Sequence, residues 1–291
     1  MGAAVVAKVA RTKAEVRQAV ALARSAGGSV VCLVPTMGAL HGGHARLIQR
    51  GRELADYLVV SIFVNPTQFG PAEDLARYPR TLELDLACCE KEGADLVFVP
   101  DETAMYPNGR NSTFVEVGGL SQIFEGASRP GHFRGVATVV LALFEIVRPD
   151  LAVFGQKDYQ QARVIARMVE DLHLPIRLVT VATVREPDGL ALSSRNRYLN
   201  PEERKAAPVL HRALEQARAL VAGGERSAER VRQAVSRSIS SEPLARLDYV
   251  AVADAASLDP LESIEPGRAA VVLAAVWIGS TRLIDNVVLM E

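Results

Sequence analysis

Short apolar runs alternate with longer amphipathic segments over the first two-thirds of the chain. Runs of four to eight residues rich in Val, Ile and Leu are typical of strands buried on both faces of a parallel sheet. The predicted strands are residues 30–34, 58–64, 96–99, 151–154 and 176–181. Segments that place their apolar residues on one helical face separate them, and the predicted helices are residues 43–54, 81–92, 136–147 and 159–172.

This alternation predicts right-handed βαβ units and an α/β fold, a Rossmann-like doubly wound parallel sheet. Ligands of such sheets bind beyond the carboxyl ends of the strands. We therefore expect the chemistry of this protein directly after Val34, Val64 and Phe154.

The pattern changes after about residue 183. A polar stretch over residues 185–200 contains Pro187 and Gly189 and has weak strand and helix signals. It is followed by predicted helices and then by predicted strands, at residues 201–222, 228–240, 247–253, 269–278 and 283–289. The chain is thus predicted to form a Rossmann-like domain over residues 1–182 and a smaller C-terminal α+β domain over residues 183–291.

Composition excludes several classes of protein. With 49% hydrophobic and 23% charged residues, the 291-residue chain is not a disordered one. A formal charge of −1 indicates no general attraction to nucleic acid or anionic membrane, and no apolar stretch is long enough to span a bilayer. Three cysteines, including the adjacent Cys88 and Cys89, fit neither a disulfide framework nor a CxxC metal site. We expect a soluble cytoplasmic protein without nucleic-acid or membrane partners.

Two histidines follow the first long predicted strand, in the segment PTMGALHGGH at residues 35–44. His41 and His44 stand where a strand turns into a helix, and two glycines separate them. A helix N-terminus with glycines suits phosphate, and imidazole N–H groups can stabilise charge on a phosphoryl group. The segment resembles the His-Ile-Gly-His signature of adenylyl-transferring Rossmann enzymes. The alternative is two ordinary surface histidines, and zinc is disfavoured because no third ligand lies at suitable spacing.

A second polar cluster follows Val64. Asn65 and Gln68 offer neutral amides that can bind hydroxyl or carboxylate oxygens, within a loop defined by two prolines and a glycine. Taken alone, this cluster is better explained as a polar turn with capping side chains.

Two more clusters carry cations. Lys157 follows Phe154 at a helix start, where the helix dipole disfavours a cation, so we expect it to face an anion; Gln161 lies one turn further. A solvated lysine with Asp158 as helix cap is the alternative. Arg195, in the sequence Ser193-Ser194-Arg195, could clamp a triphosphate, although a plain interdomain loop is the favoured interpretation of this cluster taken alone.

Seven sequence blocks together resemble the pantothenate synthetase family, whose members join pantoate to β-alanine. The blocks are VPTMGALHGGH (34–44), SIFVNPTQF (61–69), EDLARYPRT (73–81), EGASRPGHFRGV (125–136), FGQKDYQQ (154–161), DGLALSSRNRYL (188–199) and STRLIDN (280–286). The resemblance implies an ATP-dependent ligase that forms pantoyl adenylate and pyrophosphate, after which β-alanine displaces AMP. It also implies Mg²⁺ with the ATP and a homodimer.

The resemblance assigns roles by motif match. His41 and His44 are implied to contact the phosphates, with His44 as proton donor, and Lys157 and Arg195 are implied to stabilise charge. The residues implied to surround ATP are Met37, Gly38, Ala39, Leu40, His41, Gly42, Gly43, His44, Gly155, Gln156, Lys157, Asp158, Val184, Leu192, Ser193, Ser194 and Arg195. Those implied to bind pantoate are Gln68, Gln161 and Asn65.

An acyl adenylate hydrolyses when water reaches it, so the implied reaction requires a site that closes. The proline-flanked loop over residues 69–78 and the smaller domain that carries residues 193–195 are the predicted lids.

This chain departs from the family at two positions. Gly42 replaces a residue that is usually acidic or polar, and Gln156 replaces glutamate; we expect both to tune phosphate or metal contact. Some members of the family have an acidic residue that contacts the metal, and Asp85 is the only acidic residue of this chain at the matching place. Two alternative functions stay open at this stage, another nucleotidyltransferase of the same fold and a non-catalytic ATP-binding regulator.

Overall fold

The computed structural model describes residues 7–25, 27–71, 73–110 and 112–289. The chain divides into two compact units. Unit 1 comprises Met1–Gly155 and Val164–Val181, and unit 2 comprises Gln156–Arg163 and Ala182–Glu291. Each unit is described by itself below.

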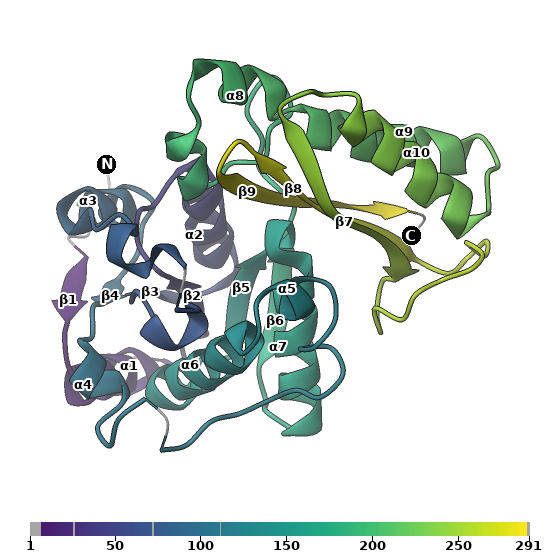
Figure 1. Cartoon of the computed structure of the whole chain (residues 1–291). Coiled ribbons are helices and arrows are strands. Elements are labelled where there is room, and N and C mark those ends of the chain that lie inside the picture. Colours follow the sequence, from purple (N-terminus) through teal and green to yellow (C-terminus); the bar gives the residue numbers. More distant parts are fainter. Residues whose placement is uncertain (1–6, 26, 72, 111, 290–291) are drawn as a thin grey trace. The chain divides into compact units, whose positions relative to one another are not determined.

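A six-stranded parallel sheet forms the centre of unit 1, with strand order β1-β4-β3-β2-β5-β6 (Figure 1). The strands are β1 (Lys8–Ala10), β2 (Val31–Thr36), β3 (Tyr57–Ile62), β4 (Leu96–Phe98), β5 (Leu151–Gly155) and β6 (Arg177–Val181). All five predicted strands are present, and the predicted fold class is confirmed. The edge strand β1 was not predicted, because three residues are too few for a periodic signal.

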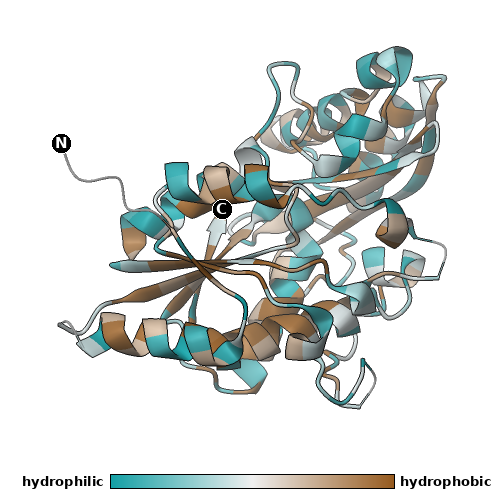
Figure 2. Ribbon diagram, turned by 90° about the vertical axis from the view of Figure 1, so that its left-hand side faces the viewer, coloured by the Kyte–Doolittle hydropathy of each residue, from teal (hydrophilic) through white to brown (hydrophobic). Residues whose placement is uncertain are grey.

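Helices cover both faces of this sheet (Figure 2). They are α1 (Lys13–Ser25), α2 (Gly42–Leu54), α3 (Leu82–Lys91), α4 (Glu102–Met105), α5 (Glu125–Ser128), α6 (His132–Val147) and α7 (Tyr159–Asp171). Side chains of α2 and α3 pack with β2, β3 and β5 in one core cluster, whereas α1 packs beside α6. Double coverage explains why Val31, Cys32, Leu33 and Val34 are all completely buried.

Unit 2 contains a three-stranded antiparallel sheet with helices packed against it. Its strands are β7 (Ala245–Asp254), β8 (Ala270–Ile278) and β9 (Thr281–Leu289), and its helices are α8 (Pro201–Ala206), α9 (Val209–Ala222) and α10 (Ala228–Ser240). The helix predicted over residues 201–222 is divided into two, because Pro208 lacks the N–H that would continue the first helix.

The short segment 156–163 groups with unit 2, although it follows β5 directly. Tyr159 Oη donates to the carbonyl of Ala255 at 2.8 Å, and Arg163 Nε donates to that of Ala256 at 2.9 Å. The sequence predicted a single domain boundary near residue 183. The hydrogen bonds of Tyr159 and Arg163 show that the earlier segment 156–163 also belongs to unit 2. Among the described residues, no helix is both long and apolar enough to cross a membrane.

Candidate active site

The two predicted histidines form the N-terminal cap of α2. His41 is the N-cap residue, and its Nδ1 accepts a hydrogen bond from Gly43 N at 3.1 Å. The Nδ1 of His44 in turn accepts from His41 N at 3.3 Å, so the two side chains make a reciprocal capping box. The ring centroids lie 4.2 Å apart. The cap thereby holds both imidazoles at the positive end of the helix dipole.

These contacts also select the tautomer of both rings. A nitrogen that accepts from a backbone N–H carries no proton, so the neutral imidazole carries its hydrogen on Nε2. His41 and His44 each therefore present an Nε2–H donor at the first turn of α2. Paired N–H donors at a helix N-terminus suit the oxygens of a phosphate group.

Asp85 on α3 holds the loop that leads into this cap. Its Oδ2 accepts from Ala39 N at 3.0 Å and its Oδ1 from Leu40 N at 2.8 Å, and the side chain is buried. Gly38 has a φ of +79°, and a Cβ there would lie 2.9 Å from Asp85 Oδ2. Both carboxylate oxygens of Asp85 thus accept hydrogen bonds from the backbone of the loop that precedes α2. Within the described residues, no cluster of three His, Cys, Asp or Glu side chains could hold a metal ion.

A cavity of about 350 Å³ opens in unit 1 beside the same loop. It lies where β2, β3 and β4 end, which is the edge of the sheet predicted to carry ligands. Its lining residues are Met37, Gly38, Ile62, Phe63, Val64, Pro66, Leu75, Pro79, Arg80, Thr81, Leu82, Asp85, Val99, Pro100, Glu102 and Arg110.

Gln68 ends a short 3-10 helix, η1 (Pro66–Gln68), and its side chain has a defined orientation. Its Oε1 accepts from Asn65 Nδ2 at 3.1 Å, and its Nε2 lies 2.9 Å from Met37 Sδ. Asn65 is buried, and its Oδ1 accepts from Thr67 N and from Tyr106 Oη. Gln68 thus retains one amide hydrogen for a ligand, whereas the amide of Asn65 is directed at protein groups.

The backbone of Gln68 is held by the segment that starts α6. His132 Nδ1 lies 2.8 Å from Gln68 O, and Arg129 Nη2 donates to the same carbonyl at 3.3 Å. Because a carbonyl only accepts, His132 carries its hydrogen on Nδ1, and its Nε2 accepts from Arg129 Nη1 at 3.1 Å. Arg129 also forms a two-point ion pair with Glu73 at 2.6 and 2.8 Å. Glu73 lies in the predicted lid loop, residues 69–78.

In unit 2, Lys157 lies in the 3-10 helix η3 (Gln156–Asp158), directly before α7. Its Nζ is 3.4 Å from Asp158 Oδ1, and its side chain is mostly covered, at 20% exposure. Gln161 lies on the first turn of α7 and is half-buried. A lysine weakly paired to one carboxylate at this place can compensate the charge of an anion.

The segment with Arg195 forms a separate short 3-10 helix, η4 (Ser194–Tyr198). Ser193 Oγ caps it by accepting from Arg195 N at 3.2 Å, and Asn196 Nδ2 donates to Ala191 O at 3.0 Å. The serine hydroxyls and the guanidinium are half-buried. Val184 and Leu192 precede this helix on a small hairpin, joined by a bond from Leu192 N to Val184 O at 3.0 Å.

The predicted residues are thus distributed over both units. Residues 37–44, Asn65, Gln68, Asp85 and Gly155 belong to unit 1, and residues 156–158, Gln161, Val184 and 192–195 belong to unit 2. Sequence reasoning missed the residues that support them, namely Glu73, Arg129, His132, Asp285 and Asn286. A usable signal was available for the last two, because they interrupt the apolar strand pattern LIDNVVL.

Comparison with known proteins gives one consistent result. A family model described as pantoate-beta-alanine ligase matches residues 8–288. Pantothenate synthetase of Moorella thermoacetica is 57% identical over 279 residues, which cover 96% of this chain and 97% of that protein. A crystal structure of pantothenate synthetase from Thermus thermophilus has a TM-score of 0.88 at 46% identity, and the match covers 96% of this chain and 98% of that one.

A second solved structure is the pantoate-beta-alanine ligase of Francisella tularensis, complexed with beta-gamma ATP and beta-alanine. It has a TM-score of 0.77 at 32% identity and covers 97% of both chains. Family model, sequence relatives and structures agree along almost the whole chain. The chain therefore belongs to the pantoate–β-alanine ligase family.

Proposed function

We propose that this protein joins pantoate to β-alanine at the expense of ATP, forming pantothenate, AMP and pyrophosphate. Support comes from the family match over residues 8–288 and from the relative solved with ATP and β-alanine. Within the chain, the observation that carries the proposal is the double-histidine cap, which equips the first turn of α2 with two Nε2–H donors.

The family resemblance supports the following contacts with ATP. His41 and His44 donate to phosphate oxygens, and His44 supplies the proton where charge leaves with pyrophosphate. Lys157 and Arg195 compensate charge on the phosphates. The other proposed ATP contacts are Met37, Gly38, Ala39, Leu40, Gly42, Gly43, Gly155, Gln156, Asp158, Val184, Leu192, Ser193 and Ser194.

In the first step, the carboxylate of pantoate attacks the α-phosphorus and pyrophosphate leaves, which gives pantoyl adenylate. A carboxyl group is ionised near neutral pH, so the step requires positioning and charge stabilisation rather than a general base. Gln68 and Gln161 are proposed to hold pantoate through neutral amides, which leave its carboxylate nucleophilic. Asn65 is proposed to act through Gln68, because its own amide is engaged by Gln68, Gly135, Thr67 and Tyr106.

In the second step, the amine of β-alanine attacks the acyl carbonyl, a C–N bond forms, and AMP leaves. The amine must lose a proton first, so this step is expected to be faster at mildly alkaline pH. Acyl adenylates hydrolyse when water reaches them. We propose that loop 69–78 excludes water, and the ion pair of its Glu73 with Arg129, the residue that ends α5, supports this role.

Mg²⁺ is expected to arrive with ATP. Within the described residues no three His, Cys, Asp or Glu side chains gather at one place to hold a metal ion, and each oxygen of Asp85 accepts a backbone N–H group. On the family resemblance, we further propose that the protein works as a cytoplasmic homodimer, which light scattering coupled to gel filtration would test.

The test is pyrophosphate release from Mg-ATP, first with pantoate alone and then with β-alanine. We expect a single turnover with pantoate and steady turnover once β-alanine is added. His44→Gln is expected to lose at least about 100-fold in rate, whereas His173→Asn, at an exposed histidine after α7, is the matched control. Pyrophosphate release that depends on neither pantoate nor β-alanine, or a His44→Gln enzyme with the wild-type rate, would contradict the proposal.

A further inference from the structure

Two consecutive buried polar residues stand inside the apolar strand β9. Asp285 and Asn286 are 4% and 2% exposed, and the flanking Leu283 and Val287 belong to the apolar core of unit 2. Buried polar groups are costly unless they are hydrogen-bonded. The contacts that these two side chains make therefore indicate what they do.

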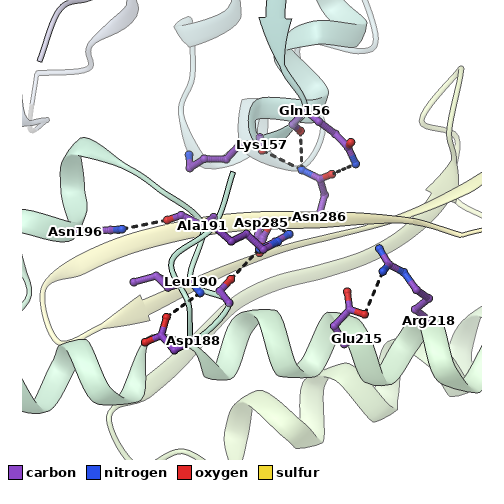
Figure 3. Close-up of polar contacts among 12 residues, drawn as sticks. Gln156, Lys157, Asp188, Leu190, Ala191, Asn196, Glu215, Arg218, Asp285 and Asn286 are labelled. Carbon is purple, nitrogen blue, oxygen red and sulfur yellow. Dashed lines mark hydrogen bonds and ion pairs between the residues drawn. The ribbon is translucent and has the colours of Figure 1, made fainter. Parts of the chain in front are cut away.

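Asn286 binds the backbone of the segment that carries Lys157 (Figure 3). Its Nδ2 donates to Gln156 O at 2.8 Å and to Lys157 O at 3.0 Å. Its Oδ1 accepts from the Gln156 side chain, whose Nε2 lies 3.3 Å away. Both amide hydrogens thus hold consecutive carbonyls of η3, which fixes the two peptide planes from which the Lys157 side chain projects.

Asp285 binds the hairpin that leads to Ser193 and Arg195. Its two oxygens form a two-point ion pair with Arg185, at 2.5 and 3.0 Å, and Oδ1 also accepts from Asn286 N at 2.8 Å. Arg185 Nη1 donates further to Gly189 O at 3.1 Å, across the hairpin. The carboxylate thereby holds both arms of the hairpin through one guanidinium.

Successive side chains of a strand point to opposite faces of the sheet. Asp285 shares its face with Leu283 and Val287, which pack in the core with α9, whereas Asn286 points away from that core. Two consecutive positions of β9 thus bind η3 on one face of the strand and the hairpin on the other. All of these contacts lie within unit 2.

We propose that Asp285 and Asn286 are positioning residues, which set the segments of Lys157 and of Ser193–Arg195 at a fixed spacing for the phosphates of ATP. This inference rests on the proposed function. The side-chain chemistry is specific, because only an amide can donate to two carbonyls and accept from a third group at Asn286. A carboxylate is likewise required at Asp285 to pair with the half-buried guanidinium of Arg185.

The first test compares Asn286→Asp, an isosteric change that removes both donors, with Asp248→Asn as matched control. Asp248 lies on β7 and accepts from Arg282 of β9, the strand that carries Asn286, at 2.7 Å. For Asn286→Asp we expect the dissociation constant of a non-hydrolysable ATP analogue, measured by calorimetry, to rise by about 10- to 100-fold. The control should bind as the wild type does. Where Asn286→Asp fails to fold, Asn286→Ala removes the same donors without burying a charge.

A double-mutant cycle separates positioning from general destabilisation. If Asn286 acts through Lys157, the loss caused by Asn286→Ala should largely vanish in a Lys157→Ala background. Additive losses, or affinity equal to that of the control, would overturn the proposal. Analogue binding requires neither pantoate nor turnover. A wild type that binds the analogue but releases no pyrophosphate would therefore refute the proposed function and leave this test intact.

Discussion

Gly135 provides the sharpest test of how unit 1 holds Gln68. It lies in the first half of α6, where a glycine-to-alanine change ordinarily stabilises a helix by about 1 kcal/mol. Here a Cβ would lie 2.6 Å from Thr67 C and 2.7 Å from Gln68 N, both backbone atoms that cannot rotate away. Ordinary contact begins at 3.4 Å, so α6 and η1 would have to separate by about 0.8 Å.

The expected magnitude follows from this clash. Overpacking costs about 1–3 kcal/mol, and the bond from Asn65 Nδ2 to Gly135 O, now 3.1 Å, contributes about 1 kcal/mol that would weaken. Against the helical gain, we expect Gly135→Ala to lower the free energy of unfolding by about 1–3 kcal/mol. A Gln68 displaced by nearly 1 Å should lower kcat/KM for pantoate by about 100-fold.

The assays are urea denaturation and steady-state pyrophosphate release with pantoate varied. Gly118→Ala is the matched control, because a Cβ at Gly118 meets nothing within 4 Å. A Gly135→Ala protein as stable as the control, with unchanged kinetics for pantoate, would refute the argument that this close approach positions Gln68.

Three further predictions follow from single side chains. Asp85→Asn should raise KM for ATP by roughly 10-fold, since an amide cannot accept from both Ala39 N and Leu40 N; a shifted Mg²⁺ requirement at unchanged KM would instead favour a metal ligand. Burial lowers the pKa of His211 from 6.5, so below pH 6.5 the imidazole binds a proton more readily in the unfolded chain than in the folded one. The free energy of unfolding of the wild type, relative to that of His211→Gln, should therefore fall between pH 7 and pH 5. A difference that stays constant over this range would disprove the prediction. Burial raises the pKa of the Cys32 and Cys89 thiols to about 12, so at pH 8 iodoacetamide should modify these two residues only after unfolding. The half-buried Cys88 should react first, and peptide mass spectrometry measures the order of modification.

Much of the architecture could be predicted from local pattern. Buried strands such as Val31–Thr36 are apolar on both faces, and the amphipathic period of α2 and α7 is clear in the sequence. The elements β1, α1, α4 and α5 were not predicted. The strand β1 and the four-residue helices α4 and α5 are too short for a period to be recognised. The 13-residue α1, which buries Val16 and Val20, has an apolar face as marked as that of α2 and was predictable.

The candidate site was predictable to the extent that its chemistry is local. His41 and His44 lie three residues apart at a strand end, so both the motif and its place at a helix N-terminus follow from the sequence. Their tautomer does not, because it depends on which backbone N–H each Nδ1 accepts. The hydrogen bonds of the buried Asn65 were not predictable either, because they join it to residues as distant as Tyr106 and Gly135.

By itself, then, the sequence determined the fold class, and it predicted the edge of the sheet where ligands are expected and the residue types of the candidate site. These depend on periodicity and spacing over a few residues, which the order of amino acids contains directly. Tertiary structure alone decided which groups hold the candidate residues in place. Asn286 is 129 residues from Lys157 and Asp285 is 100 residues from Arg185, and such pairings arise only when packing brings distant segments together.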